Sequence, residues 1–331
     1  MALPASLVGR LRLPVVAAPM FLVSGPDLVM ATCRAGVLGT FPALNQRTTA
    51  GLDEWLTTLD TALGDDDAPY GVNLIVHRTN PRVAADLEVI VAHRVPLVIT
   101  SLGAAAEVVS AVHSYGGVVF HDVTSAHHAH KAADAGVDGL ILVAVGAGGH
   151  GGTLSPFALM AEARAFFRGT ILLAGALSSG SDVLAARAMG ADLAYLGTRF
   201  VATTESLASD AYRGQIVSGT AADIVYTPGV STIPANFLRR SLELAGLDPD
   251  ATLGPTDLGH LTNPSGADAK AWRDIWSAGQ GVAGIDDVLP VAELVDRLAR
   301  EYADARARLC AEDWVTGGGP GSHPPPSLAP S

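Results

Sequence analysis

The sequence predicts an α/β protein that folds as a (β/α)8 TIM barrel, and three observations lead to this fold class. Eight strand-like runs occur in the first 200 residues, most of them are continuously apolar, and Ala-rich helical patterns separate several of them. Continuous apolar runs are typical of strands buried on both faces of a parallel sheet, and eight strand–helix units close a barrel. A doubly wound open sheet is the competing arrangement, which periodicity alone does not exclude.

The eight runs are short and rich in Val, Ile, Leu and Ala. They cover residues 13–20, 36–42, 70–76, 95–102, 116–123, 138–145, 170–177 and 193–200. Helical patterns such as "PFALMAEARAFFRG" and "GSDVLAARAMGAD" lie between the later runs. They carry a glycine near the C-terminal end, where glycine commonly terminates a helix.

The chain beyond the eighth run differs from the barrel in its pattern. Residues 204–288 carry scattered Gly, Pro and Thr with short helical patterns. This segment is too long for a loop and predicts a smaller, mainly helical insertion domain that caps the substrate site. An amphipathic pattern over 290–310 predicts the closing helix. We therefore expect the barrel at 1–203 and 289–314, followed by a disordered Gly/Pro/Ser-rich tail at 315–331.

Composition restricts the classes of protein to which the chain can belong. Its 331 residues are 49% hydrophobic and 16% charged, as in a packed globular protein. A formal net charge of -12 argues against nucleic acid or an anionic membrane as partner, because both need a basic face. No secretory signal is apparent, and no apolar run reaches the ~20 residues of a membrane helix. Two cysteines, Cys33 and Cys310, suit the reducing cytoplasm, where we expect the protein.

Three clustered histidines raise the question of a metal site. His127, His128 and His130 are separated by one, two and three positions, so no pair has the i, i+4 separation of helical zinc sites. We interpret them as lying on an exposed helix face and predict no metal site.

Small residues follow the last two predicted strands, where TIM barrels commonly bind a phosphate group. Gly175, in "AGALSSG", lets the backbone approach a ligand closely, and Gly197 and Thr198, in "LGTRF", offer an amide and a hydroxyl. The two loops together predict a phosphate cradle. Each glycine by itself is equally consistent with a tight strand-to-helix turn.

The residues at the ends of several other predicted strands indicate a function less specifically. These are Pro19, Met20 and Phe21 on the first strand, Asn73 within the third, Thr100 and Ser101 on the fourth, and His121 and Asp122, on opposite faces, on the fifth. A polar amide within an apolar strand needs a partner, which for Asn73 is either neighbouring backbone or a ligand.

The stretch "LILVAVGAGGHGGTLS" (140–155) places a histidine among five glycines after the sixth strand. Gly146, Gly148 and Gly151 match the G-x-G-x-x-G spacing of a dinucleotide-binding turn, but no acidic residue follows about 20 positions later, as that motif requires. His150 is either a surface histidine or a proton-transferring group presented over the barrel mouth. Its position a few residues after a buried strand favours function.

Together these residues resemble the nitronate monooxygenases, formerly called 2-nitropropane dioxygenases, which are FMN-dependent TIM barrels. The resemblance spans nearly the whole chain. It rests on "APM" (18–20), "GVNL" (71–74), "AGGH" (147–150), "AGAL" (174–177), "GTRF" (197–200) and "IWSAGQGVAGIDDV" (275–288).

The resemblance implies a site for FMN at the barrel mouth, with His150 as the catalytic residue that contacts the substrate. The implied cofactor-binding residues are Gly175, Ala176, Gly197 and Thr198 at the phosphate, and Met20, Phe21, Leu22, Asn73, Asp122, Gly148 and Gly149 near the ring. Two positions depart from the family. Gly146 replaces a frequent acidic residue, and Asp122 stands where some relatives have a lysine near the flavin.

The implied reaction is oxidation of an alkyl nitronate with O2 to a carbonyl compound and nitrite. The expected partners are therefore a small-molecule substrate and O2, and a homodimer is left open. Three alternatives use the same fold. They are an NAD(P)H-dependent flavin reductase resembling quinone or enoyl-(acyl carrier protein) reductases, a flavin-binding module without turnover, and a flavin-free barrel acting on a sugar phosphate.

Overall fold

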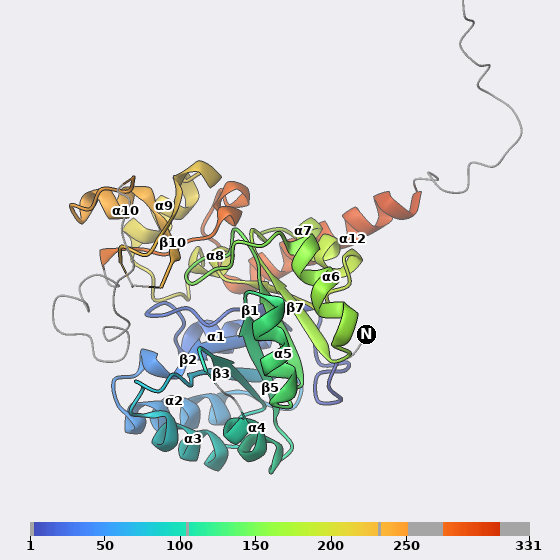
Figure 1. Cartoon of the computed structure of the whole chain (residues 1–331). Coiled ribbons are helices and arrows are strands. Elements are labelled where there is room, and N and C mark those ends of the chain that lie inside the picture. Colours follow the sequence, from blue (N-terminus) through green and yellow to red (C-terminus); the bar gives the residue numbers. More distant parts are fainter. Residues whose placement is uncertain (1–2, 104–105, 231–232, 251–273, 312–331) are drawn as a thin grey trace, which may run out of the picture.

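Eight parallel strands close into a barrel, which confirms the predicted fold class (Figure 1). The computed structural model describes residues 3–103, 106–230, 233–250 and 274–311. The strands are β1 (Val15–Ala17), β2 (Leu38–Pro42), β3 (Tyr70–Ile75), β4 (Leu97–Ser101), β5 (Val118–Val123), β6 (Gly139–Val143), β7 (Thr170–Ala174) and β8 (Leu193–Leu196). β8 pairs with β1 in parallel, so the sheet is closed rather than open and the doubly wound alternative is wrong.

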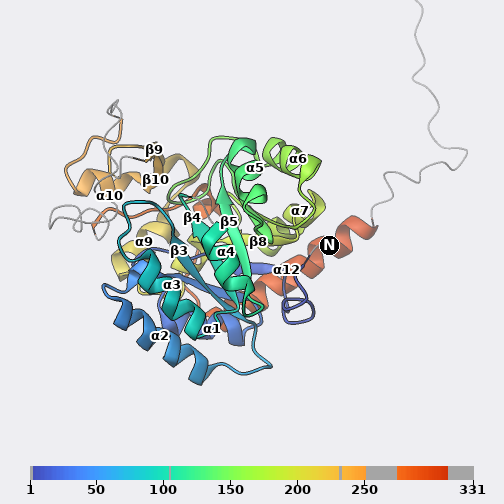
Figure 2. The same ribbon diagram turned by 60° about the horizontal axis from the view of Figure 1, so that its bottom comes forward.

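Helices surround the strands on the outside (Figures 1 and 2). They are α1 (Pro26–Arg34), α2 (Thr49–Ala62), α3 (Val83–Ala92), α4 (Ala106–His113), α5 (Ala126–Asp134), α6 (Pro156–Phe166), α7 (Gly180–Ala188) and α12 (Val291–Ala311), with the short turn η1 (Ala43–Asn45) after β2. α12 packs against both α7 and α1, so it closes the helical ring as the amphipathic pattern predicted. No helix in the described ranges is long and apolar enough to cross a bilayer.

Alternate residues of each strand point into the barrel or out toward the helices. One buried cluster, which includes Ile99, Phe120 and Tyr195, fills the barrel interior. A larger cluster packs the strands against the helices. On β5, Phe120 belongs to the interior cluster. The alternation therefore places Asp122 inside the barrel and His121 outside, on the opposite faces that the sequence predicted.

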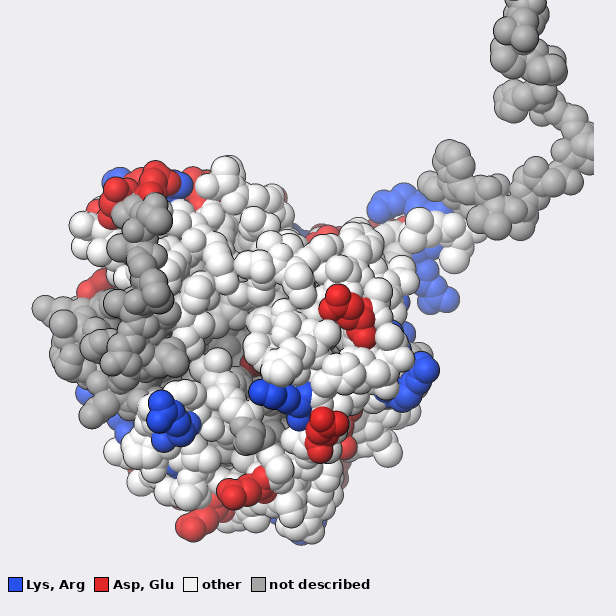
Figure 3. Space-filling model, viewed as in Figure 1, with Lys and Arg blue, Asp and Glu red and all other residues white. Residues whose placement is uncertain are grey.

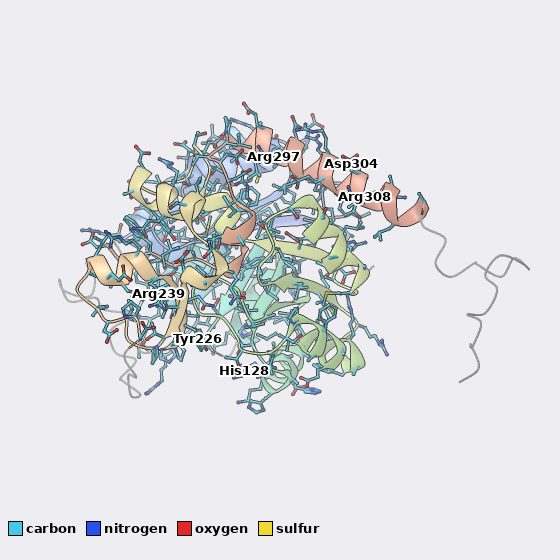
Figure 4. All side chains as sticks on the ribbon, turned by 90° about the horizontal axis from the view of Figure 1, so that it is seen from above. His128, Tyr226, Arg239, Arg297, Asp304 and Arg308 are labelled. Atoms are coloured by element: carbon cyan, nitrogen blue, oxygen red, sulfur yellow. The ribbon has the colours of Figure 1, made fainter. Side chains whose placement is uncertain are left out.

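The segment after β8 combines helices with a small sheet. It contains α8 (Thr198–Val201), α9 (Asp210–Ser218), η2 (Ala221–Asp223), β9 (Ile224–Thr227), β10 (Ala235–Leu238), α10 (Arg239–Leu244) and η4 (Gln280–Gly284). The sequence predicted a mainly helical segment at 204–288 and missed the antiparallel β9–β10 pair. Figure 4 looks onto this segment and labels Tyr226 on β9. Residues 251–273 and the proposed tail at 315–331 lie outside the described residues.

Candidate active site at the barrel mouth

The loop after β1 exposes apolar side chains at the C-terminal end of the barrel. Asn45 holds this loop, because its Nδ2 donates to the carbonyls of Met20 (3.0 Å) and Ser24 (2.7 Å) and its Oδ1 accepts from the amide of Leu22 (2.9 Å). Phe21 is 42% exposed and Leu22 is 40% exposed. The sequence-predicted segment Met20–Leu22 therefore presents a fixed apolar surface at the mouth.

Three of the four described non-glycine residues with left-handed φ angles lie at the same end of the barrel, and the fourth, Arg94, precedes β4 at the other end. Leu22, Leu102 and Ala176 have φ angles of 58°, 61° and 55°, in the left-handed region that side chains disfavour. They follow β1, β4 and β7, respectively. Residues held in such conformations cluster at functional sites, because surrounding contacts must impose them. The strain thus marks the mouth as the candidate site.

A chain of hydrogen bonds crosses three neighbouring strands inside the barrel. Asn73 on β3 donates from Nδ2 to the carbonyl of Ile99 (3.2 Å) and to Oγ of Ser101 on β4 (2.8 Å). Ser101 in turn donates to Oδ2 of Asp122 on β5 (2.5 Å). The question left open for Asn73 is answered in part, since its amide nitrogen bonds both backbone and a neighbouring side chain.

The carboxyl group of Asp122 is only half satisfied. Its Oδ1 is buried and has no hydrogen-bond partner among the described residues. Burial raises the pKa of Asp122 to about 6, although the Ser101 hydrogen bond opposes the shift. Tyr195 on β8 shares the interior, and burial, followed by the negative charge of Asp122, raises the pKa of its phenol well above the usual value. Tyr195 therefore stays protonated and can donate a hydrogen bond.

The glycine-rich loop that carries His150 is clamped by two segments distant in sequence. Asn236 on β10 donates from Nδ2 to the carbonyl of Ala147 (2.6 Å) and from its amide to the carbonyl of Gly149 (2.8 Å). On the other side, the amide of Gln280 donates to the carbonyl of Gly146 (2.9 Å). The loop is consequently a fixed platform rather than a free surface turn.

Close packing explains two of the loop's glycines. Gly148 lies against the segment before η4, because a Cβ on it would come within 3.0 Å of the amide nitrogen of Gly279. Gly146 has φ of +84°, and a Cβ there would lie 2.9 Å from Oε1 of Gln280 and 3.3 Å from Cβ of Ala176. An acidic side chain at Gly146 would therefore adopt a disfavoured left-handed φ and would displace the flexible end of Gln280.

His150 is neutral at physiological pH. Burial lowers the pKa of His150 to about 4, because the charged imidazolium would lose its hydration. A neutral imidazole can accept a proton or exchange a hydrogen bond with a substrate, but it does not attract an anion by charge.

The loops after β7 and β8, which the sequence predicts to hold a phosphate group, contain glycines for different reasons. Gly175 (φ +135°) is required by the fold, because a Cβ on it would come within 2.8 Å of the carbonyl oxygen of Val145. Gly197 has φ of -103°, and a Cβ there would meet nothing closer than Ala18 at 3.7 Å. Neither backbone conformation nor protein packing demands glycine at Gly197, so its missing side chain leaves room for a ligand.

Thr198 and its neighbours offer hydrogen-bond donors beside Gly197. Thr198 begins α8, whose first turn has no side-chain cap, and the first amides of a helix lack partners within it. The hydroxyl oxygen of Thr198 accepts a hydrogen bond from the amide of Gly279 (2.9 Å), which leaves its own hydrogen available. Arg199 pairs with Asp287 (2.8 Å) and is 2% exposed, so its charge belongs to the structure rather than to the cradle.

Asn45, Tyr195, Asn236 and Gln280 are site residues that the sequence interpretation missed. Asn45, Asn236 and Gln280 act on loops far away in sequence, and no local pattern signals such contacts. Alternation along the eighth strand could have placed Tyr195 inside the barrel.

The clustered histidines lie on the outer helix α5. His127, His128 and His130 are exposed on α5, and Figure 4 shows His128 at the edge of the molecule. Within the described ranges no group of three potential ligands could hold a metal ion. The face in Figure 3 carries scattered acidic and basic side chains without a broad basic patch.

Comparison with known proteins places the chain in a family. The family model described as nitronate monooxygenase matches residues 6–301. The chain belongs to the nitronate monooxygenase family. A nitronate monooxygenase from Paraburkholderia phytofirmans is 28% identical, with coverage of 89% of this chain and 94% of the relative. The family and its curated members identify the protein as an oxidoreductase.

Other matches carry different names. A (3aS,4S,5R,7aS)-5-hydroxy-7a-methyl-1-oxo-octahydro-1H-indene-4-carboxyl-CoA dehydrogenase from Mycobacterium tuberculosis is 30% identical, over 69% of this chain and 64% of the relative. The structure of a nitroalkane oxidase from Streptomyces ansochromogenes has a TM-score of 0.77 and 28% identity, with coverage of 92% and 100% of the two chains. FabK from Thermotoga maritima shares the fold, with a TM-score of 0.77 and 24% identity over 92% and 97%.

Membership in this family supports a flavin cofactor, and the described residues fit one. Phe21 and Leu22 offer apolar surface for a ring, and the open space at Gly197 suits a phosphate group held by amides. The unpartnered Oδ1 of Asp122 offers a hydrogen-bonding position inside the mouth.

Proposed function

We propose that the protein is an FMN-dependent nitronate monooxygenase that oxidises alkyl nitronates with O2 to carbonyl compounds and nitrite. The observation that carries this proposal is the loop of His150, which Asn236 clamps at the C-terminal end of the barrel through the carbonyls of Ala147 and Gly149, beside the open space at Gly197. Family membership supports the reaction class.

Each part of the site has a distinct role in this proposal. Gly197 and Thr198, with Gly175 and Ala176, would hold the phosphate of FMN. The apolar segment Met20–Leu22 and the polar side chains of Asn73 and Asp122 would surround the ring, and Gly148 and Gly149 would leave space for it. The bound flavin would supply electron acceptance from the substrate and reactivity with O2.

His150 would orient the substrate by a hydrogen bond to its nitro or nitronate oxygen. A neutral imidazole with one N–H can donate to that oxygen.

Anaerobic mixing tests the proposal directly. We expect a short-chain alkyl nitronate to bleach the flavin absorbance rapidly, whereas NADH and NADPH bleach it slowly or not at all. Rapid bleaching by nicotinamides without bleaching by nitronate would contradict the monooxygenase assignment. Protein that stays colourless after incubation with FMN would contradict the flavin assignment itself.

An NAD(P)H-dependent reductase on the same scaffold is the second candidate function. It is supported by the 30% identity to a relative named as a dehydrogenase. The same anaerobic experiment separates the two candidates, because only the reductase requires electron transfer from a nicotinamide.

A further inference from the structure

Asp122 is the one strand-end carboxyl group of the described barrel mouth with a buried, unpartnered oxygen. Its Oδ2 is already engaged by Ser101 at 2.5 Å. Ser101 has a single hydrogen, which it gives to Asp122, while its lone pair accepts from Asn73 at 2.8 Å. The arrangement therefore fixes the direction of the carboxyl group and leaves Oδ1 as its only unused atom.

No positive charge compensates this carboxyl group. Within the described part of the chain, Ser101 and Asn73 on β4 and β3 are uncharged, and no Lys or Arg interacts with Asp122. Titratable residues at the mouth include Tyr195 on β8, His150 after β6 and His77 after β3; burial keeps Tyr195 and His150 uncharged at neutral pH, and Nδ1 of His77 bonds to Oγ1 of Thr79 (2.8 Å). A lysine at this position would carry the opposite charge. Asp122 and a lysine would therefore form different electrostatic interactions with a bound ligand.

A ligand over the mouth makes the charged form of Asp122 still less favourable. A buried carboxylate oxygen without a hydrogen-bond donor costs free energy that a protonated carboxyl group avoids. A protonated carboxyl group also gains an O–H that can donate to an acceptor on the ligand. Flavin rings carry such acceptors, and their reduction creates negative charge that a neighbouring carboxylate would repel.

We propose that Asp122 binds the flavin as an uncharged carboxyl group, so that flavin binding takes up one proton from solvent onto this side chain. The inference rests on the proposed function, because it requires a flavin at the mouth. The balance is simple: carboxylate plus solvent proton gives the carboxylic acid, and no bond of the flavin changes.

The sign of the pH dependence follows from this uptake. In the free protein the pKa of Asp122 is already raised to about 6, so below pH 6 the group is protonated before binding and affinity is constant. Above pH 6 each binding event must take up a proton. The flavin Kd should then rise by up to about tenfold per pH unit until the pKa of the bound state is reached.

Fluorescence titrations with two flavins test the proposal. The second ionisation of the FMN phosphate occurs near pH 6, whereas riboflavin has no phosphate, so riboflavin isolates the contribution of Asp122. For wild type we expect the riboflavin Kd to rise about tenfold or more between pH 6 and pH 8. For Asp122→Asn it should change less than about twofold, and the exposed Asp134→Asn on α5 should behave as wild type.

Two further measurements distinguish proton uptake by Asp122 from a purely structural role of this residue. Calorimetry of binding at pH 7.5, in buffers with different ionisation enthalpies, should give uptake of about one proton for wild type and about none for Asp122→Asn. Ser101→Ala retains the carboxyl group but removes the hydrogen bond that lowers its pKa. The pH at which affinity begins to fall should therefore move upward in this variant.

Equal pH dependence of riboflavin binding in wild type and Asp122→Asn would overturn the inference, as would pH-independent binding by wild type. In either case the protein still binds flavin and the proposed function stands. Folded wild-type protein that binds neither flavin at any pH would overturn the proposed function, and this inference with it.

Discussion

Asp192 and Asp122 lie at opposite ends of the barrel and differ in how their carboxyl groups are paired. Asp192 precedes β8, is 3% exposed, and accepts hydrogen bonds at Oδ2 from the amide of Ile171 (2.9 Å) and from Arg164. Asp122 ends β5 and has one oxygen bonded to Ser101 and the other without a partner. The first carboxyl group stabilises the fold, and the second is left available for a ligand.

A second aspartate at the N-terminal ends of the strands is also paired. Asp138, before β6, repeats the arrangement of Asp192 and accepts from the amide of Val119 at 2.7 Å. Left-handed φ angles occur at Leu22, Leu102 and Ala176 at the mouth, and at Arg94 before β4 at the other end. A (β/α)8 barrel separates stability from function in this way, because ligands meet the C-terminal ends of its strands.

Removing the paired aspartate should have the largest effect. Asp192→Ala leaves Arg164 and the amide of Ile171 without their partner, and breaking such a buried pair costs about 3 kcal/mol. We expect urea unfolding to report this loss of stability. Asp122→Asn should cost less than about 1 kcal/mol, and an equal loss in both variants would remove the distinction between the two ends.

Replacing the histidine at the mouth should affect catalysis and leave the fold intact. His150→Ala should retain the flavin colour and lower kcat about 100-fold, the lower range for a proton-transferring or orienting group. Steady-state oxygen consumption with an alkyl nitronate measures this. The exposed His128→Ala is the control, and unchanged turnover in His150→Ala would show that His150 does not act on the substrate.

His121, adjacent to Asp122 but outside the barrel, predicts a pH dependence of stability. It is 7% exposed, its Nδ1 lies 2.7 Å from Oγ1 of Thr100, and burial lowers its pKa to about 4. As the pH falls below about 6.5, His121 becomes protonated in the unfolded chain but stays neutral in the folded protein. The free energy of unfolding therefore decreases.

The size of this effect can be isolated by comparing two proteins. Between pH 7 and pH 4.5 the His121 contribution should fall by about 2 kcal/mol. His121→Asn should therefore lose less stability than wild type over this range in urea unfolding. Parallel stability curves for the two proteins would show that His121 titrates normally in the fold.

The smallest predicted effect concerns the cradle. Gly197→Ala fits the protein, because the new Cβ would lie 3.7 Å from Ala18, but it occupies space assigned to the ligand. The Kd for FMN should rise about tenfold, equivalent to about 1.4 kcal/mol, with little change in stability. Gly64→Ala, where a Cβ meets nothing within 4 Å, is the control, and unchanged FMN affinity in Gly197→Ala would place the phosphate elsewhere.

The barrel could be predicted from the sequence because its signals are local. Buried parallel strands read as apolar runs, and the closing helix reads as an amphipathic pattern that the structure shows at Val291–Ala311. The predicted limits of individual strands were less accurate. The run at 193–200 contains only four strand residues, because the chain turns at Gly197 into α8. The β9–β10 pair was missed because its strands are short and lie in a segment rich in Gly, Pro and Thr.

The site could be predicted only where it follows strand ends. His150, Asn73 and Gly197 lie at the mouth as expected, since their position follows from the barrel topology. The clamp made by Asn236 depends on a hairpin 86 residues after His150 in sequence, and the unpartnered oxygen of Asp122 depends on the geometry of three strands. Such contacts arise from tertiary packing and leave no local pattern.

A crystal structure of the protein reconstituted with FMN tests the central claim most directly. The account predicts the phosphate within hydrogen-bonding distance of the Thr198 amide and a flavin acceptor atom within that distance of Asp122 Oδ1. Flavin bound away from the C-terminal ends of the strands, or Asp122 Oδ1 left without a flavin contact, would contradict it.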